Sequence, residues 1–401
     1  MLNWAEECQK FTPELSCVVV DGDAAHRAEL AESWPAADLV VTSYDLLRRD
    51  EALYEGQEFY ACILDEAQAI KNHTTQKYKA VCKVRSRVRF ALTGTPVENR
   101  LGELWSIFSF LMPGYLPPYK SFCSRFEKPI VQEEDQTAVR RLNQLTGPFI
   151  LRRMKADVLK ELPPKTENVY RIELEEEQRK LYLAAVVDAR EKLQAAKPED
   201  KMAVFAVLMR LREICCDPRL IADNWEGGSA KLDACAELVS SAVEGGHRIL
   251  LFSQFTSMLE LLAKRLDAEG ISHFTLQGST PKPVRAELVR RFNGGEVSVF
   301  LISLRAGGTG LNLTAADIVI HYDPWWNVAA QNQATDRAYR IGQQNPVQVY
   351  KLIAQDTIEE KIVELQQAKQ SLADTVTGTA DGAILSMRPD ELLQLLEGSE
   401  P

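Results

Sequence analysis

Short apolar runs alternate with amphipathic segments in two stretches of the chain, residues 1–112 and 231–365. Each run ends in a polar or glycine-containing turn, and the segments between the runs have helical spacing. This alternation is typical of α/β proteins, in which helices bury a parallel sheet on both faces. The runs expected to form strands lie at residues 16–22, 37–45, 59–67, 88–96, 247–255, 271–278, 297–308, 317–324 and 347–354.

The middle and the end of the chain have a helical pattern instead. Residues 173–194 and 201–216 predict two long helices, and Glu175, Glu176 and Glu177 fall in a first turn, where the helix dipole favours acidic residues. We therefore expect two α/β domains, separated by a helical insertion with a linker and followed by C-terminal helices. In chain order, these four parts are 1–112, 113–230, 231–365 and 366–401.

Composition and charge restrict the partners. The formal net charge is −10, whereas a protein that binds nucleic acid through bulk charge is usually basic, so any such contact must come from local patches. The eight cysteines lack CxxC spacing, which argues against structural zinc and suits a reducing cytoplasm. No apolar run approaches the about 18 residues of a membrane span, and the first residues do not resemble a signal peptide. We therefore expect a cytoplasmic protein with no membrane partner.

Two acidic residues follow one of the expected strands. Asp65 and Glu66 come after the apolar run that begins at Phe59, at the carboxyl edge of a parallel sheet, where open α/β sheets bind ligands. An aspartate there can hold Mg²⁺ through water, and an adjacent glutamate can orient the attacking water in phosphoryl transfer. The alternative is a solvated acidic pair at a strand end.

Turns with glycine follow two further strands. Residues 93–96 read Thr-Gly-Thr-Pro before a helix that opens near residues 98–99, and their hydroxyl and N–H groups could sense a phosphate or a carboxylate. Gly307, Gly308 and Gly310 form a loop whose backbone could approach a phosphate closely. The alternatives are a plain strand-to-helix turn and a flexible loop.

Two arginines near the C-terminal end of the second α/β stretch are spaced as on one helix face. Arg337 and Arg340 could clamp phosphates as arginine fingers do. The alternative is a charged helix surface with Asp336 as a partner. The phosphate-binding pattern GxxxxGK[ST] occurs nowhere in the 401 residues.

Local basic segments indicate nucleic-acid contact. Seven basic residues and no acidic one lie between Lys71 and Leu92, a smaller cluster lies at residues 152–155, and Trp325 and Trp326 follow a strand end. This pattern fits binding to a phosphate backbone with little sequence readout. The alternatives are a solvated basic face and a buried tryptophan pair.

Taken in order, these segments resemble the Swi/Snf-type ATPases, the chromatin-remodelling branch of helicase superfamily two. The resemblance runs nearly from end to end, and its motifs in chain order are NWAEECQKF after motif Ia, VVTSYD (Ib), DEAQ (II), LTGTPVENRLGELWSIFSFLMPG (III), PFILRRMKADVLKELPPKTE as the linker, LLFSQF (IV), SLRAGGTGLNLT (V) and DPWWNVAAQNQATDRAYRIGQ (VI). It implies an α/β fold of two RecA-like P-loop NTPase lobes that close on ATP and Mg²⁺ while gripping double-stranded DNA.

The resemblance also implies residue roles. Asp65 would hold Mg²⁺ and Glu66 would be the catalytic base, while Gln68 would couple to the other lobe. The second lobe would contribute the arginine fingers Arg337 and Arg340, the assisting Gln333, and Gly310 at the interface. The expected DNA contacts are Thr42, Ser43, Tyr44, Gln254, Ser303 and Arg305, to which the basic pattern adds Lys79, Arg85 and Arg87.

The family's P-loop precedes the segment that residues 3–11 resemble. We therefore expect a first lobe truncated at its N-terminus, with apolar faces partly uncovered, and very weak or no ATP hydrolysis by these residues alone. The expected function is that of an ATP-dependent double-stranded-DNA translocase or remodeller of the bacterial cytoplasm and nucleoid. A DNA-bound protein complex, such as polymerase or a nucleoid protein, is a further expected partner. The alternatives are a non-catalytic DNA-binding or scaffolding module and an RNA-directed helicase.

Overall fold

The computed structural model describes residues 2–94, 101–133, 135–153, 158–197, 200–222, 224–307, 311–366 and 389–397. The chain forms two compact units, and the main boundary between them lies between Leu151 and Arg152. Of the segments singled out above, residues 95–99, Gly308 and Gly310 lie outside the described ranges. Within these ranges, every helix is too short or too polar to cross a membrane.

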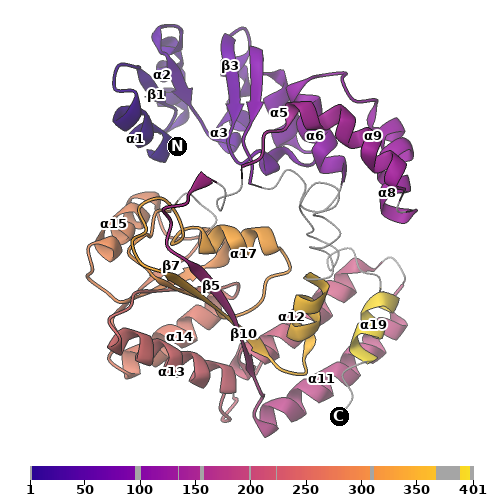
Figure 1. Ribbon diagram of the computed structural model, residues 1–401, viewed down its shortest axis with the longest axis vertical. Coiled ribbons are helices and arrows are strands. Elements are labelled where there is room, and N and C mark those ends of the chain that lie inside the picture. Colours follow the sequence, from indigo (N-terminus) through magenta and orange to yellow (C-terminus); the bar gives the residue numbers. More distant parts are fainter. Residues whose placement is uncertain are drawn as a thin grey trace. The chain divides into compact units, whose positions relative to one another are not determined.

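The first unit contains two pairs of short parallel strands (Figure 1). Strand β1 (Cys17–Val19) pairs with β2 (Leu39–Val41), and β3 (Glu58–Leu64) pairs with β4 (Arg85–Ala91). The four apolar runs therefore form strands, and their parallel pairing is confirmed.

Helices alternate with the strands of this unit along the chain. They are α1 (Leu2–Phe11), α2 (Ala24–Glu32), α3 (Tyr44–Arg49), α4 (Glu51–Tyr54), α5 (Gln76–Lys83) and α6 (Leu101–Leu111). Side chains at the N-caps begin several of them, as where Ser43 Oγ accepts from the Leu46 N–H and Thr75 Oγ1 accepts from the Tyr78 N–H. Leu47, Val81 and Phe110 join the strands in one apolar cluster.

The expectation of a sheet buried on both faces is wrong for β3 and β4. No element in the described part of the unit covers the large apolar side chains that these strands present to solvent, because the helices pack on only part of the sheet. The exposed side chains are those of Tyr60, Ile63, Val88 and Phe90.

The segment expected as a helical insertion contributes to both units. Helices α7 (Tyr119–Phe122), α8 (Lys128–Gln132) and α9 (Gln136–Thr146) pack with α6 in a second apolar cluster of the first unit. Helices α11 (Glu176–Ala195) and α12 (Lys201–Cys216) belong to the second unit, and both match predicted helices. They pack against residues 358–366 and helix α19 (Pro389–Glu397).

The second unit is built on a six-stranded parallel sheet with strand order β5-β10-β9-β6-β8-β7. The strands are β5 (Lys165–Ile172), β6 (Ile249–Ser253), β7 (His273–Leu276), β8 (Val299–Ser303), β9 (Ile318–His321) and β10 (Val347–Ala354). Every residue of β6, β8 and β9 is buried, as their continuous apolar runs predict.

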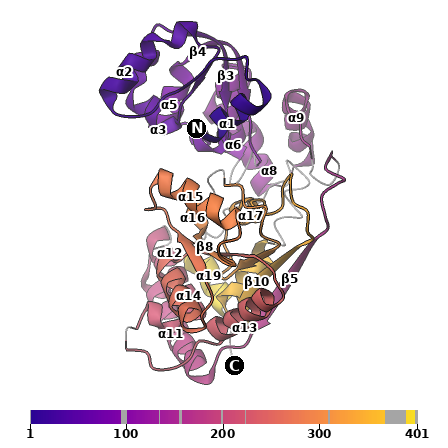
Figure 2. The same ribbon diagram turned by 90° about the vertical axis from the view of Figure 1, so that its left-hand side faces the viewer.

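Helices cover both faces of this sheet (Figure 2). Helices α13 (Ala230–Glu244) and α14 (Thr256–Ala268) pack on one face, against Ile249, Leu251 and their neighbours. The other face meets α15 (Lys282–Asn293), α16 (Leu304–Gly307) and α17 (Val328–Thr335), against Leu250, Phe252 and their neighbours. Alternate residues of one strand thus fill two separate cores.

Strand β5 has no counterpart in the sequence prediction. It forms the edge of the sheet and pairs with β10 along its whole length, from Lys165 opposite Val347 to Ile172 opposite Ala354. Most of its side chains are exposed, so its sequence, KTENVYRI, lacks the apolar run that marks a buried strand. The composition of an edge strand of this kind does not identify it as a strand. Only its pairing with a neighbouring strand does so.

A buried arginine joins the helical layer to the sheet. The guanidinium of Arg212 on α12 is fully buried and donates to Asp323 Oδ2 at 3.0 Å, to the Pro324 carbonyl at 2.6 Å and to Gln254 Oε1 at 2.6 Å. It also stacks over the buried ring of Trp326, 4.5 Å from the centroid. The tryptophan pair therefore packs beneath this arginine, in agreement with the structural alternative for these residues.

Replacing Arg212 by methionine should destabilise the second unit strongly. The change leaves Asp323 buried without its counter-charge, which typically costs about 3–5 kcal/mol. The free energy of unfolding in urea measures the effect. R179M, which removes an exposed arginine of α11, is the matched control and should stay within about 0.5 kcal/mol of the parent. A cost for R212M no larger than that of R179M would contradict the assigned role.

A buried histidine gives this unit a pH dependence. His321, the last residue of β9, bonds through Nε2 to Thr335 Oγ1 at 2.9 Å and stacks on Phe252. Burial, helped by the charge of Lys351, lowers the pKa of His321 to about 3. The folded unit therefore holds a neutral imidazole where the unfolded chain holds a charged one below its ordinary pKa of 6.5.

Stability should fall as the pH drops from about 6.5 towards 3, because the unfolded state binds a proton that the folded state excludes. The expected slope is about 1.4 kcal/mol per pH unit for this one group. H321Q should remove about 2 kcal/mol of the stability change between pH 7 and pH 5, measured by urea unfolding. H273Q, at a half-buried histidine of the same unit, should keep the parent's pH dependence. An unchanged slope in H321Q would exclude this histidine as the cause.

Candidate functional site

The acidic pair lies directly after β3, as the sequence predicts. Leu64 at the end of the strand is buried, whereas Asp65 is exposed and Glu66 is half-buried. Glu66 has a φ of 50°, in the left-handed region that costs a residue other than glycine about 1–2 kcal/mol. Its N–H donates to Asp65 Oδ1 at 2.9 Å. The chain thus turns sharply here and leaves Asp65 at the open end of the strand.

Two aromatic side chains from distant segments bond to Asp65. The indole Nε1 of Trp4 on α1 donates to Asp65 Oδ2 at 2.8 Å. The hydroxyl of Tyr44, the first residue of α3, donates to the Asp65 carbonyl oxygen at 2.8 Å. Burial, with the negative charge of Asp65 next in size, raises the pKa of Tyr44 well above its usual value, so its hydroxyl stays a donor. Sequence spacing gives no signal for either contact.

A hydrogen-bonded chain connects the acidic pair to the end of the neighbouring strand. The Gln68 Nε2 donates to Glu66 Oε2 at 2.5 Å, and the Thr93 Oγ1 donates to Gln68 Oε1 at 2.9 Å. Backbone bonds run beside this chain, from the Leu92 N–H to the Leu64 carbonyl. The structure thus brings together Glu66, Gln68 and Thr93, three residues singled out from two separate motifs.

The donor set at Asp65 suits a hydrated Mg²⁺. Magnesium usually keeps several waters and takes one or two carboxylates plus the substrate's phosphates. Asp65 offers an exposed carboxylate whose direction is fixed by Trp4 and the Glu66 N–H. The described residues contain no cluster of three or more His, Cys, Asp or Glu side chains that could hold a metal ion.

Arg337 and Arg340 lie beyond the helix on which they were expected. Helix α17 ends at Thr335, and the Arg337 N–H bonds to the Ala334 carbonyl in the turn that follows, so the expectation of one helix face is wrong. Both arginines meet the glycine-containing loop. The Arg337 Nε donates to the Gly307 carbonyl at 3.0 Å, and the Arg340 Nη1 donates to the Leu311 carbonyl at 3.3 Å.

Gly307 itself is required by packing. A Cβ at this position would lie 2.8 Å from the Phe252 ring, so any other residue would displace the loop from the sheet. Gln333, predicted to assist the arginines, is half-buried on α17.

The predicted DNA contacts of the second unit follow β6 and β8. Ser253 and Ser303 are register partners at the ends of these strands, and the buried Ser303 hydroxyl has no hydrogen-bond partner among the described residues. Gln254 is held in place by Arg212 and by its own N–H, which donates to Asp323 Oδ1 at 3.1 Å. Arg305 lies on α16, and its side chain is outside the described part.

The predicted contacts of the first unit lie between β2 and α3 and along β4. Thr42 follows β2, and Ser43 caps α3 with its hydroxyl at 3.3 Å from the Leu46 nitrogen. Lys79 and Arg85 are exposed and have no ion pair among the described residues. Acidic side chains partly neutralise four other residues of this basic cluster, while Arg89 donates to the carbonyl oxygens of Phe110 and Val84. The pairs are Lys71–Glu103, Lys77–Asp45, Lys83–Glu51 and Arg87–Glu58.

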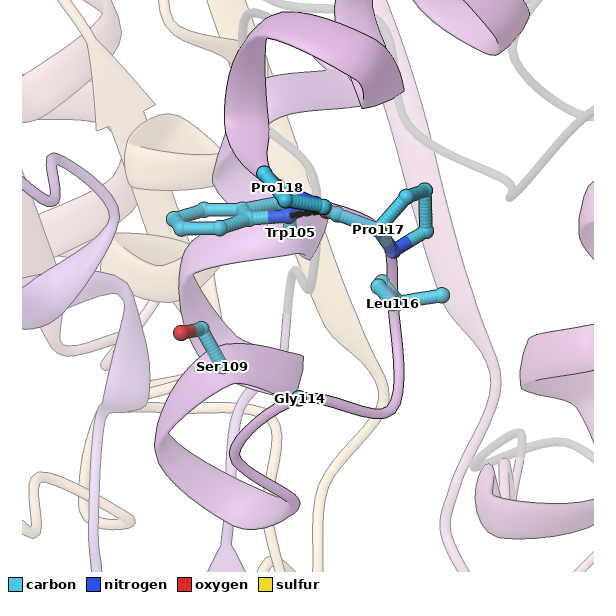
Figure 3. A pocket seen from close by; sticks show the side chains of 6 residues that line it. All are labelled: Trp105, Ser109, Gly114, Leu116, Pro117 and Pro118. Carbon is cyan, nitrogen blue, oxygen red and sulfur yellow. Dashed lines mark hydrogen bonds between the residues drawn. The ribbon is translucent and has the colours of Figure 1, made fainter.

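A pocket of about 370 Å³ lies beside α6, away from the predicted residues. Its lining consists of Trp105, Ser109, Gly114, Leu116, Pro117 and Pro118 (Figure 3). The Trp105 Nε1 donates to the Pro117 carbonyl at 2.8 Å, which fixes the loop after the helix. The lining has no ionisable side chain and includes neither Asp65 nor Glu66.

Two family models match the chain. The SNF2-related domain matches residues 1–220, and the helicase conserved C-terminal domain matches residues 230–342.

Curated relatives and solved structures match over nearly the whole chain. An uncharacterized ATP-dependent helicase of Mycoplasma pneumoniae is 39% identical over 99% of the chain and 38% of its own length. A putative ATP-dependent helicase/translocase, YwqA, of Bacillus subtilis is 39% identical over 98% of the chain and 44% of its own length. The chain thus spans about two fifths of the length of these relatives.

The Sulfolobus solfataricus SWI2/SNF2 ATPase core, solved in complex with dsDNA, is 34% identical and covers 98% of this chain and 83% of its own, with a TM-score of 0.50. The same core domain in a second structure is 35% identical, covers 99% and 82%, and has a TM-score of 0.51. These matches confirm the predicted α/β fold of two RecA-like lobes. The chain belongs to the SNF2 family of helicase-like ATPases.

Proposed function

We propose that this chain is the motor part of an ATP-dependent translocase that moves on double-stranded DNA. One observation carries the proposal: the hydrogen-bonded chain from Glu66 through Gln68 to Thr93 beside Asp65, in a member of the SNF2 family. The names of two similar proteins support translocation on double-stranded DNA. One is a putative helicase/translocase, and the other was solved in complex with dsDNA.

The acidic pair would divide the work of ATP hydrolysis. Glu66 would take up the proton of the attacking water as general base, while the Gln68 amide holds one of its carboxylate oxygens in place. Asp65 would hold a hydrated Mg²⁺ through its exposed carboxylate. When bound with ATP, Mg²⁺ would neutralise charge on the phosphates. The bond from Thr93 would tie the position of Gln68 to the end of β4.

The second unit would supply positive charge to the phosphates. Arg337 and Arg340 would act as arginine fingers, with Gln333 beside them on α17 and the loop of Gly310 before them. The Gly307 carbonyl oxygen holds the guanidinium of Arg337, and the Leu311 carbonyl oxygen holds that of Arg340.

DNA would be bound through the strand ends and the exposed basic residues. Ser303 has a buried hydroxyl without a partner in the described structure, which would reach DNA only if its surroundings opened. Ser43 lies directly before α3 and caps it. Gln254 would contact DNA only if its bond to Arg212 opened. Thr42 and Arg305 complete the proposed set, together with Lys79, Arg85 and Arg87. Tyr44, the remaining predicted contact, would bind DNA only if its bond to the Asp65 carbonyl oxygen opened.

The protein would act in the bacterial cytoplasm and nucleoid. Two of the matched relatives are bacterial, from Mycoplasma pneumoniae and Bacillus subtilis. A DNA-bound protein complex, such as polymerase or a nucleoid protein, is the proposed protein partner.

Replacing Glu66 by glutamine in the intact protein should abolish DNA-stimulated ATP hydrolysis, by at least about 100-fold, and leave ATP affinity nearly unchanged. The change removes the base but keeps the hydrogen-bonding shape of the side chain. Phosphate release measures turnover, and fluorescent nucleotide titration measures binding. E55Q, at an exposed glutamate after α4, is the control and should match the parent. Undiminished turnover in E66Q would refute the role of Glu66, and absent turnover in the parent would favour a non-catalytic DNA-binding module.

Replacing Lys79, Arg85 and Arg87 together by alanine should weaken binding to duplex DNA about tenfold or more. Each lost phosphate contact lowers the dependence of log affinity on log salt by about 0.9, so the slope should fall by about 2–3. Fluorescence anisotropy at several salt concentrations measures both quantities. R179A/K192A/K264A removes three basic residues of the second unit and controls for net charge. If the two triple variants bind duplex DNA alike, the cluster is only a solvated surface. If the parent protein binds RNA more tightly than duplex DNA, the RNA-directed alternative is supported.

A further inference from the structure

Three hydrogen bonds fix Asp65, and each acts on a different atom. The Glu66 N–H bonds to Oδ1, the Trp4 indole to Oδ2 and the Tyr44 hydroxyl to the main-chain carbonyl. The two aromatic donors lie 61 and 21 residues before Asp65 in the chain.

We propose that Trp4 and Tyr44 are positioning residues that hold Asp65 in the orientation that receives a hydrated divalent cation. This inference rests on the proposed function, because it takes Asp65 as the residue that binds the ion. Neither aromatic residue touches the reacting atoms, so both act only through Asp65.

Tyr44 controls the peptide between Asp65 and Glu66. Its hydroxyl holds the carbonyl oxygen of that peptide, and Asp65 Oδ1 holds the N–H of the same peptide. The peptide is thus fixed on both sides immediately before Glu66, whose φ of 50° is unfavourable. Without the hydroxyl, the peptide can rotate and Glu66 can relax to an ordinary conformation. That relaxation would turn the Asp65 carboxylate with it.

Trp4 controls the carboxylate itself. An ionised carboxylate has about four lone-pair sites, so a bond from the indole and one from the Glu66 N–H leave sites for the waters around an ion. Partners of a ligand that fix its direction are worth about 10–100-fold in metal affinity or activity. Trp4 lies on α1, so this helix forms part of the wall of the site.

Tyr44 was also expected to contact DNA, and the geometry argues for the positioning role. Its side chain is half-buried, and its hydroxyl already bonds to a main-chain oxygen within the unit. A direct DNA contact would need that bond to break.

The test compares W4F and Y44F with D65N in the intact protein. The probe is Mn²⁺ together with a non-hydrolysable ATP analogue, and electron paramagnetic resonance measures the free ion. D65N should lose most of the Mn²⁺ affinity, and W4F and Y44F should each weaken it about tenfold. Two controls remove bonds of the same chemistry elsewhere. W225F loses an indole bond to the Gly228 carbonyl, and Y115F loses a hydroxyl bond to the Leu145 carbonyl. Both should bind Mn²⁺ within twofold of the parent.

The outcomes separate this inference from the proposed function. If D65N binds Mn²⁺ as the parent does, Asp65 is not the ligand and both fail. If D65N weakens binding while W4F and Y44F match the two controls, the proposed function stands and the positioning role is overturned. Y44F that weakens duplex DNA binding without changing Mn²⁺ affinity would make Tyr44 a DNA contact instead. Circular dichroism and thermal melting of each variant show whether it is folded, so a loss of affinity in a folded W4F or Y44F supports the inference.

Discussion

A parallel sheet covered by helices on both faces leaves polar side chains only one place to gather, the ends of its strands. In the second unit this constraint is nearly complete, since all residues of β6, β8 and β9 are buried and alternate between two apolar cores. The polar residues Ser253, Ser303 and Asp323 therefore stand at or just beyond the strand ends, where the chain leaves the apolar layers. In the first unit Asp65 also lies directly after its strand, β3, although one part of the β3–β4 sheet is exposed. The hydrophobic cores exclude polar side chains, so the side chains that could take part in chemistry lie at the strand ends.

The polar residues at the strand ends are themselves tied together. In the first unit, hydrogen bonds link α1, α3, the turn after β3 and the end of β4 through the side chains of Trp4, Tyr44, Gln68 and Thr93. In the second unit, the guanidinium of Arg212 joins α12 to the segments after β6 and β9. These contacts run between elements and not along them, so each site inherits its geometry from several parts of its unit.

The apolar runs predicted most of the strands, and the motifs predicted that Asp65, Glu66, Gln68 and Thr93 would matter. Both are local properties, visible in a few consecutive residues. Features that depend on contacts with residues distant in the sequence were not predicted. Strand β5 has a polar sequence because it lies at an edge, and Arg337 lies in the turn after α17 with its Nε bonded to the distant Gly307 carbonyl. The buried charge of Arg212 and the bonds to Asp65 depend on residues far away in the sequence. Only the structure shows which of the many polar side chains contact one another.

The edge strand β5 also has a mechanical consequence. The chain enters the second unit shortly after Arg152 and is then paired with β10 over eight consecutive residues in parallel register. A force that acted along the axis of β5 would strain all the hydrogen bonds of this ladder together instead of opening them one by one. Shear of this kind resists rupture far better than unzipping. The pairing of β5 with β10 would therefore make the second unit resistant to such a force at the point where the chain joins it.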